Sequence, residues 1–132
     1  MFNLIKIENG RMNVPEPVFY EAAAEEEIAT GEALVISEGY LTKCGAMETP
    51  THIAIGSVAA DAKNRKVAVY RVESNMLFEV PVTAVPTSLK LGDKVTLDAT
   101  ALSVTATTAS GVVTVESING ATAAGDKIVV RI

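Results

Sequence analysis

The feature that most constrains the fold of this chain is a series of about ten short, strand-like segments at near-regular spacing. In residues 66–72, for example, Val67 and Val69 alternate with the residues between them, so that the two sets point to opposite faces of a strand. Short strands at this spacing favour a sandwich or barrel over βαβ units, and the length of 132 residues fits one domain. The other segments predicted as strands from residue 33 onward are 33–36, 40–43, 53–59, 76–82, 94–98, 102–107, 112–118 and 127–132.

Three of the predicted strands follow the same local signature, a glycine and then an acidic residue. The signature occurs at Gly31-Glu32, Gly92-Asp93 and Gly125-Asp126. Because glycine adopts a positive φ without steric cost, the signature predicts a turn with glycine in the left-handed region directly before each strand. The spacings between the three are unequal, which indicates repeated turn chemistry and not an array of repeats.

The N-terminal segment has the pattern of a β-hairpin. Asn9-Gly10 is the two-residue signal for a type I′ turn, in which both residues need a positive φ. In that register Ile7 lies opposite Met12, and two prolines after the second strand end the hairpin. We therefore divide the chain into a hairpin arm, residues 1–17, and a β-barrel-like domain, residues 18–132.

The segment after the hairpin allows two interpretations. Residues 18–24 can be extended, and residues 21–28 can instead form one or two helical turns, since alanine and glutamate are good helix formers. At most one short helix is therefore expected, near residues 21–28.

The charge of the chain argues against two classes of partner. The formal net charge is -5, and the 11 lysines and arginines are scattered, whereas a nucleic-acid-binding protein normally needs a basic stripe. The same acidity disfavours an anionic membrane surface, and no segment has the length of a transmembrane helix or the form of a signal peptide. We expect neither a nucleic-acid nor a membrane partner.

The single cysteine, Cys44, excludes an intrachain disulfide. It can be a buried small apolar residue, a reactive thiol or an intermolecular partner. Only Lys43 beside it favours a thiolate, so we predict a buried thiol and a reducing compartment during folding.

Residues that carry chemistry are sparse. The single histidine, His52, cannot form a histidine metal cluster, and no Gly-x-Ser-x-Gly nucleophile motif supports a catalytic triad around it. The acidic run Glu25-Glu26-Glu27 is interpreted as a solvated face. The glycine-flanked residues 120–125 lack the Lys-Ser/Thr of a phosphate-binding loop. We predict no catalytic residue, no metal, no cofactor and no enzymatic activity.

Two parts of the chain, taken together, have a distinctive pattern of turns and strands. The first part comprises Pro50-Thr51-His52-Ile53-Ala54, Val67-Ala68-Val69-Tyr70-Arg71-Val72 and Met76-Leu77-Phe78-Glu79-Val80-Pro81. The second comprises Gly92-Asp93-Lys94-Val95-Thr96, Val104-Thr105-Ala106-Thr107-Thr108 and Ala123-Ala124-Gly125-Asp126-Lys127-Ile128-Val129-Val130-Arg131-Ile132. In this pattern, residues 28–132 resemble small head proteins that decorate, or cement, the capsid exterior of tailed bacteriophages, and the hairpin is not part of the resemblance.

The resemblance implies an all-β fold, either β-barrel or β-tulip-like, and a structural role in the virion. The expected partner is the major capsid protein, whose subunit contacts the protein would stabilise on the capsid exterior after synthesis in the host cytoplasm. Self-association, as a homo-oligomer and often a trimer, is also expected. The alternative from another functional class is a carbohydrate-binding or adhesion β-sandwich module, which the low aromatic content of 5% disfavours.

The residues predicted to contact capsid or a neighbouring subunit are Phe2, Leu4, Ile5 and Ile7. They concentrate apolar surface in a segment that cannot fold alone. A second interpretation, of nearly equal weight, is that this segment completes the domain's own sheet.

Overall fold

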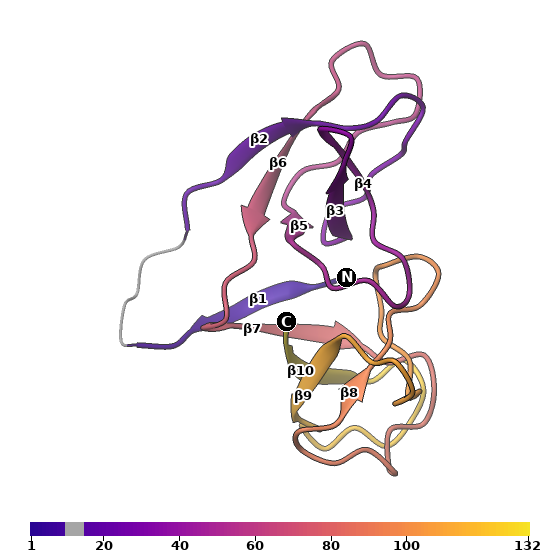
Figure 1. The fold of residues 1–132 in the computed structure, drawn as a ribbon. Helices are drawn as coiled ribbons and strands as arrows, with labels where there is room; N and C mark the ends of the chain where they lie inside the picture. Colours follow the sequence, from indigo (N-terminus) through magenta and orange to yellow (C-terminus); the bar gives the residue numbers. More distant parts are fainter. Residues whose placement is uncertain (10–14) are drawn as a thin grey trace.

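The computed structural model describes residues 1–9 and 15–132, and within these ranges the fold is all-β with ten strands in two antiparallel sheets. Sheet A contains, in spatial order, β1 (Asn3–Ile7), β7 (Met76–Pro81), β10 (Lys127–Arg131), β9 (Val113–Ser117) and β8 (Lys94–Val95). Sheet B contains β2 (Val18–Glu21), β6 (Lys66–Arg71), β5 (His52–Ala54), β3 (Ala33–Ser37) and β4 (Tyr40–Lys43). The two sheets form the lower and upper layers of Figure 1.

Each sheet curls around its own apolar interior. In β7, Met76, Phe78 and Val80 are buried and alternate with half-buried residues, as expected for a strand with one face on a core. The edges of sheet B meet at a single bridge between Ala22 and Leu41. In sheet A, Val104 forms bridges to both Val82 and Leu97. Neither sheet is closed by a continuous ladder in the described chain, so the sandwich alternative describes the fold better than a closed barrel.

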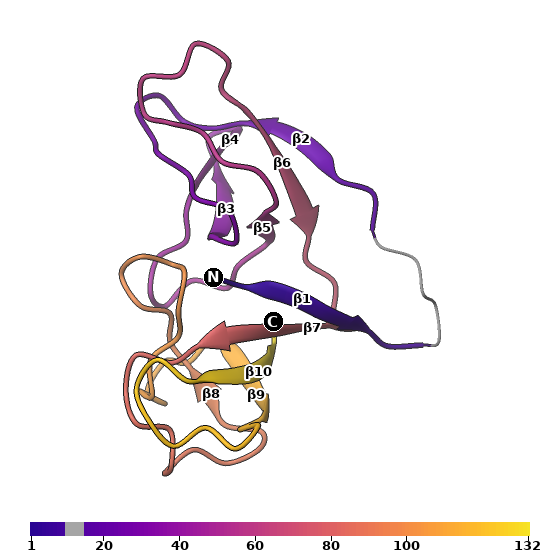
Figure 2. The same ribbon diagram turned by 180° about the vertical axis from the view of Figure 1, so that it is seen from behind.

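A shared core joins the two sheets. Ala33, Cys44 and Ile53 from the region of sheet B belong to the same buried cluster as the interior of sheet A. A second, smaller cluster lies inside sheet B around Leu34, Leu41 and the valines of β6. Both chain termini lie at the level of the junction between the sheets in Figures 1 and 2.

The three glycine-acid signatures form the predicted turns. The φ angles are 78° at Gly31, 87° at Gly92 and 91° at Gly125. Strands β3, β8 and β10 each begin two residues after their glycine, so the prediction of left-handed glycine before each strand is confirmed.

Two of the predicted strands, at 53–59 and 102–107, differ most from the observed ones. Strand β5 stops at Ala54 because Ile55 and Gly56 both donate their N–H groups to Ala68 O, at 2.8 and 3.1 Å. The segment predicted as a strand at 102–107 contains only the bridges of Val104.

The alternative of helical turns at residues 21–28 is wrong. Strand β2 extends to Glu21, and Glu25 has a φ of 61°, which an α-helix does not accept. The guanidinium of Arg65 takes up the carbonyl groups that a helix would use, donating to Ala23 O and Glu26 O at 2.6 Å each. No helix able to cross a membrane occurs in the described parts of the chain.

Arg65 is therefore a clamp between two loops, since it also donates to Ala59 O and Ala60 O, at 2.6 and 3.0 Å. We expect Arg65→Ala to lower the free energy of unfolding by about 2 kcal/mol, because it leaves these carbonyls without their charged donor. Urea unfolding of the variant beside Lys63→Ala, an exposed residue of the same loop, measures this. Equal stability of the two variants would contradict the role of the clamp.

Candidate interaction surface

The predicted contact residues of the N-terminal segment divide between the core and the surface. Phe2 is only 2% exposed, and its ring packs edge-on against Phe78 with centroids 6.2 Å apart. Leu4 and Ile7 are partly buried against the same cluster, whereas Ile5 is 46% exposed. The first residues of the chain therefore complete sheet A, and Phe2 can contact a partner only if β1 leaves that sheet.

The pairing partner of β1 is β7, with Asn3 opposite Glu79. Asn9 has a φ of 90°, as the predicted turn requires, but Gly10 and the second strand of the predicted hairpin, up to Val14, lie outside the described residues. The register shifts between Leu4 and Lys6. A bulge of this kind on an edge strand hinders pairing with another chain.

Strand β2 is the edge of sheet B with the most exposed aromatic residue. Ala22 donates its N–H to Arg65 O on the β6 side, so alternation places the backbone groups of Phe19 and Glu21 on the outer side. The end of this outer side meets β4 at the bridge between Ala22 and Leu41, so Phe19 is the residue farther from that contact. The Phe19 side chain is 64% exposed. By contrast, the edge of β4 is covered, since Lys43 donates its N–H to Glu26 Oε1 at 3.0 Å.

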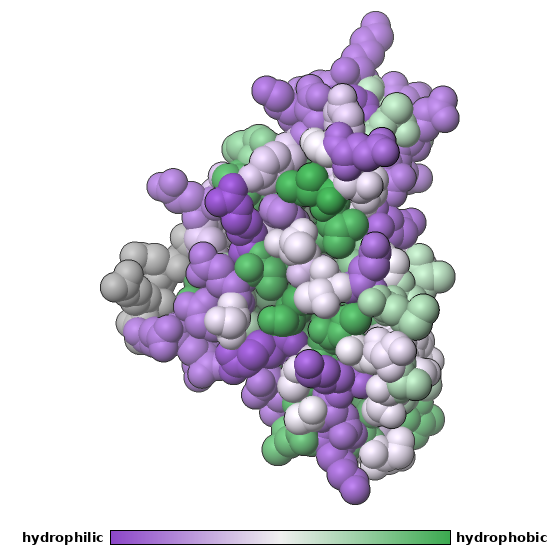
Figure 3. Space-filling model, in the orientation of Figure 1, coloured by the Kyte–Doolittle hydropathy of each residue, from purple (hydrophilic) through white to green (hydrophobic). Residues whose placement is uncertain are grey.

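Other large apolar side chains are exposed on strands and at turns, and sequence reasoning did not single them out. The signal that could have found them is their position opposite the core-facing residues of a strand or at the tip of a turn. Figure 3 shows hydrophobic residues along the middle of one face, where the sheets meet, and hydrophilic residues at the far end of sheet B. Together with Ile5, which was predicted from the sequence, the exposed set comprises Met1, Phe19, Ile36, Tyr40, Met47, Val85 and Leu91.

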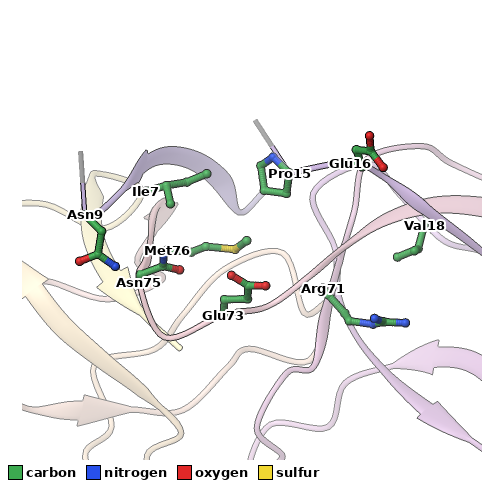
Figure 4. Close-up of a pocket in the computed structure, with 9 residues that line it drawn as sticks. All are labelled: Ile7, Asn9, Pro15, Glu16, Val18, Arg71, Glu73, Asn75 and Met76. Carbon is green, nitrogen blue, oxygen red and sulfur yellow. The ribbon is translucent and has the colours of Figure 1, made fainter. Parts of the chain in front are cut away.

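A cleft of about 560 Å³ lies where β1 ends and β2 begins. In Figure 4, Glu73 lies between Arg71 on one side and Asn75 and Met76 on the other. The lining also includes Glu16, and among the described residues it contains no hydroxyl, thiol, imidazole or amine side chain. Its charged side chains are Arg71, Glu73 and Glu16, so the cleft can accept polar backbone or charged groups.

His52 is a structural residue in this fold. It is 6% exposed, its Nδ1 pairs with Thr51 Oγ1 at 2.8 Å, and its ring packs edge-on against Tyr20. Burial and the nearby positive charge of Arg71 lower the pKa of His52. Its Nε2 is buried without a hydrogen-bond partner among the described residues.

The buried thiol prediction for Cys44 is confirmed. Cys44 is 2% exposed, its Sγ donates to Glu48 O at 3.2 Å, and burial raises its pKa to about 12. A thiol with this pKa is a poor nucleophile. In residues 1–9 and 15–132, no three His, Cys, Asp or Glu side chains are grouped so that they could hold a metal ion.

The structure thus contains exposed apolar side chains on strands and turns of both sheets. Each of the buried polar residues Glu32, His52 and Thr96 makes an internal hydrogen bond through one of its side-chain atoms. Comparison with known proteins gives no family for the chain: no family model matches it, and no curated protein is similar to it.

Proposed function

We propose that this chain is a non-enzymatic structural protein that binds other protein surfaces, and specifically the exterior of a tailed-bacteriophage capsid. There it would stabilise contacts between capsid subunits, as a homo-oligomer. The observation that carries the general proposal is the set of large apolar residues that the fold leaves exposed, foremost Leu91 at 70%, Met47 at 68% and Phe19 at 64%. The specific assignment to a capsid rests on the sequence resemblance.

Large apolar side chains that are exposed in the free protein can act as the anchor residues of a protein–protein interface. Burying one large apolar side chain contributes roughly 1.5–3 kcal/mol, and interfaces depend on a few such anchors. Phe19 is the best placed, because the outward backbone groups of β2 lie beside its ring.

The test is cosedimentation of the purified protein with capsids assembled from the major capsid protein of the same genome. The wild type is compared with Phe19→Ser, Leu91→Ser and Lys63→Ser, the last as a matched change of an exposed charged residue. We expect saturable binding of the wild type and of Lys63→Ser. Phe19→Ser and Leu91→Ser should each bind at least tenfold more weakly, because a loss of about 1.4 kcal/mol of binding free energy raises the Kd tenfold.

Two results would overturn the proposal. The first is a wild-type protein that neither sediments with capsids nor self-associates at high concentration in analytical ultracentrifugation. The second is saturable binding on a glycan array without capsid binding, which would favour the carbohydrate-binding alternative.

A further inference from the structure

The acidic residue of each glycine-acid signature closes its turn in the same way. Its N–H donates to the carbonyl three residues earlier, and its carboxylate accepts the N–H of that same earlier residue. The carboxylate bonds join Ala29 to Glu32 at 2.8 Å, Lys90 to Asp93 at 2.8 Å and Ala123 to Asp126 at 2.9 Å. The three signatures therefore share one reciprocally bonded turn. The same turn also joins Gly45 and Glu48, since Glu48 donates its N–H to Gly45 O at 3.1 Å and Gly45 donates its N–H to Glu48 Oε2 at 2.7 Å.

One of the three carboxylates is in a different environment from the others. Glu32 is 2% exposed, whereas Asp93 and Asp126 are not in the core. Its Oε2 is bonded to Ala29, but its Oε1 is buried without a hydrogen-bond partner among the described residues, and the nearest cation, Lys43 Nζ, is 4.0 Å away. An ionised carboxylate with one unsatisfied buried oxygen is unfavourable.

The turn that contains Glu32 is also where several parts of the fold meet. Phe2 donates its N–H to Gly31 O at 2.8 Å, which holds the start of β1. Ala33 donates its N–H to Ala101 O at 2.8 Å, which joins sheet B to a loop beside sheet A. Ala54 of β5 donates to Glu32 O at 3.0 Å.

We propose that ionisation of Glu32 loosens the junction between the two sheets, so that the start of β1 and the Ala101 loop are held more tightly in acid than in neutral solution. The junction is then a pH-responsive element built on a buried copy of the turn. This inference does not depend on the proposed function.

The charges around Glu32 agree with this direction. Burial raises the pKa of the Glu32 carboxyl; the Ala29 N–H and Lys43 lower it, and Glu26 and Glu27 raise it further. The titratable groups on the elements packed around the turn are Lys43 on β4, Glu26 and Glu27 before β3, His52 on β5, the Met1 ammonium and Asp98.

The sign of the effect follows from the raised pKa. A carboxyl whose pKa is higher in the folded than in the unfolded protein contributes stability below its unfolded value and loses it as the pH rises through the folded value. Asp126 is the opposite case, because the N–H groups of Thr122 and Ala123 lower its pKa. Its contribution is present at neutral pH and is lost as the pH falls.

The experiment compares wild type, Glu32→Gln and Asp126→Asn between pH 4 and pH 8, by melting temperature and by amide hydrogen exchange corrected for intrinsic rates. Glu32→Gln keeps an acceptor for Ala29 but cannot ionise. We expect it to melt above the wild type at pH 8 and to lose that advantage at pH 4. In the wild type, protection at Phe2 and Ala33 should fall several-fold between the two pH values, and in Glu32→Gln it should not.

Asp126→Asn is the matched control, because the same change in the exposed turn should lower the melting temperature at pH 8. If Glu32→Gln does not fold, NMR titration of the Glu32 carboxyl in the wild type decides the matter. A pKa at or below that of an ordinary glutamate would overturn the proposal. So would equal pH dependence of protection in wild type and Glu32→Gln.

Discussion

Replacing Phe2 with alanine is expected to lower the free energy of unfolding by about 3 kcal/mol. The side chain is buried to 2% exposure and packs on Phe78, so its loss removes apolar contacts and leaves a cavity in the core of sheet A. Urea unfolding followed by circular dichroism measures the change.

The matched control for Phe2 is Ile5→Ala on the same strand. Ile5 is 46% exposed and lies at the bulge, so this variant should change the stability by only about 0.5 kcal/mol. Capsid cosedimentation of both variants then distinguishes a residue that stabilises the fold from one that contacts the capsid. Loss of binding in Ile5→Ala at unchanged stability supports the N-terminal contact site, and an unchanged unfolding free energy in Phe2→Ala contradicts the packing of β1 on the core.

Gly111→Ala is expected to destabilise the protein by about 3 kcal/mol or more. A Cβ at Gly111 would lie 2.1 Å from Lys94 O and 2.2 Å from Lys94 C. Because these are backbone atoms of β8, no side-chain rotation relieves the clash, and β8 and β9 must separate. The melting temperature and urea midpoint report this change.

Gly120→Ala is the control, because it measures the cost of an unfavourable backbone conformation without any steric clash. Gly120 has a φ of 74°, but nothing lies within 4 Å of the position that a Cβ would occupy there. We expect a cost of about 1 kcal/mol from the positive φ alone. Equal effects of the two substitutions would show that the contact between Gly111 and β8 is looser than the structure has it.

The parts of the fold that the sequence predicts well are local. The turns at Gly31, Gly92 and Gly125 follow from the φ preference of glycine, and strand β4 has its predicted bounds because apolar alternation and flanking turn residues lie within a few positions. The pairing of β1 with β7 is not local, since residue 3 meets residue 79. Alternation alone does not specify which strand a segment joins, and the second strand that the Asn9-Gly10 signal predicts lies outside the described residues.

The candidate surface was only partly predictable for the same reason. Phe2 and Ile5 are both large apolar residues near the N-terminus, yet one is in the core and the other is exposed. Their difference depends on the β7 pairing and the bulge. The burial of Glu32 likewise depends on a junction assembled from distant segments, whereas its turn was evident from Gly31-Glu32.

The placement of β1 in sheet A has a consequence for the order of events during translation. Sheet B comes from one continuous stretch, residues 18–71, and can pair as it leaves the ribosome. Strand β1 is made first but must wait for β7, an interval on the order of ten seconds at typical synthesis rates. During that time the Phe2 ring has no core to enter, so nascent chains on neighbouring ribosomes have an opportunity to exchange their first strands.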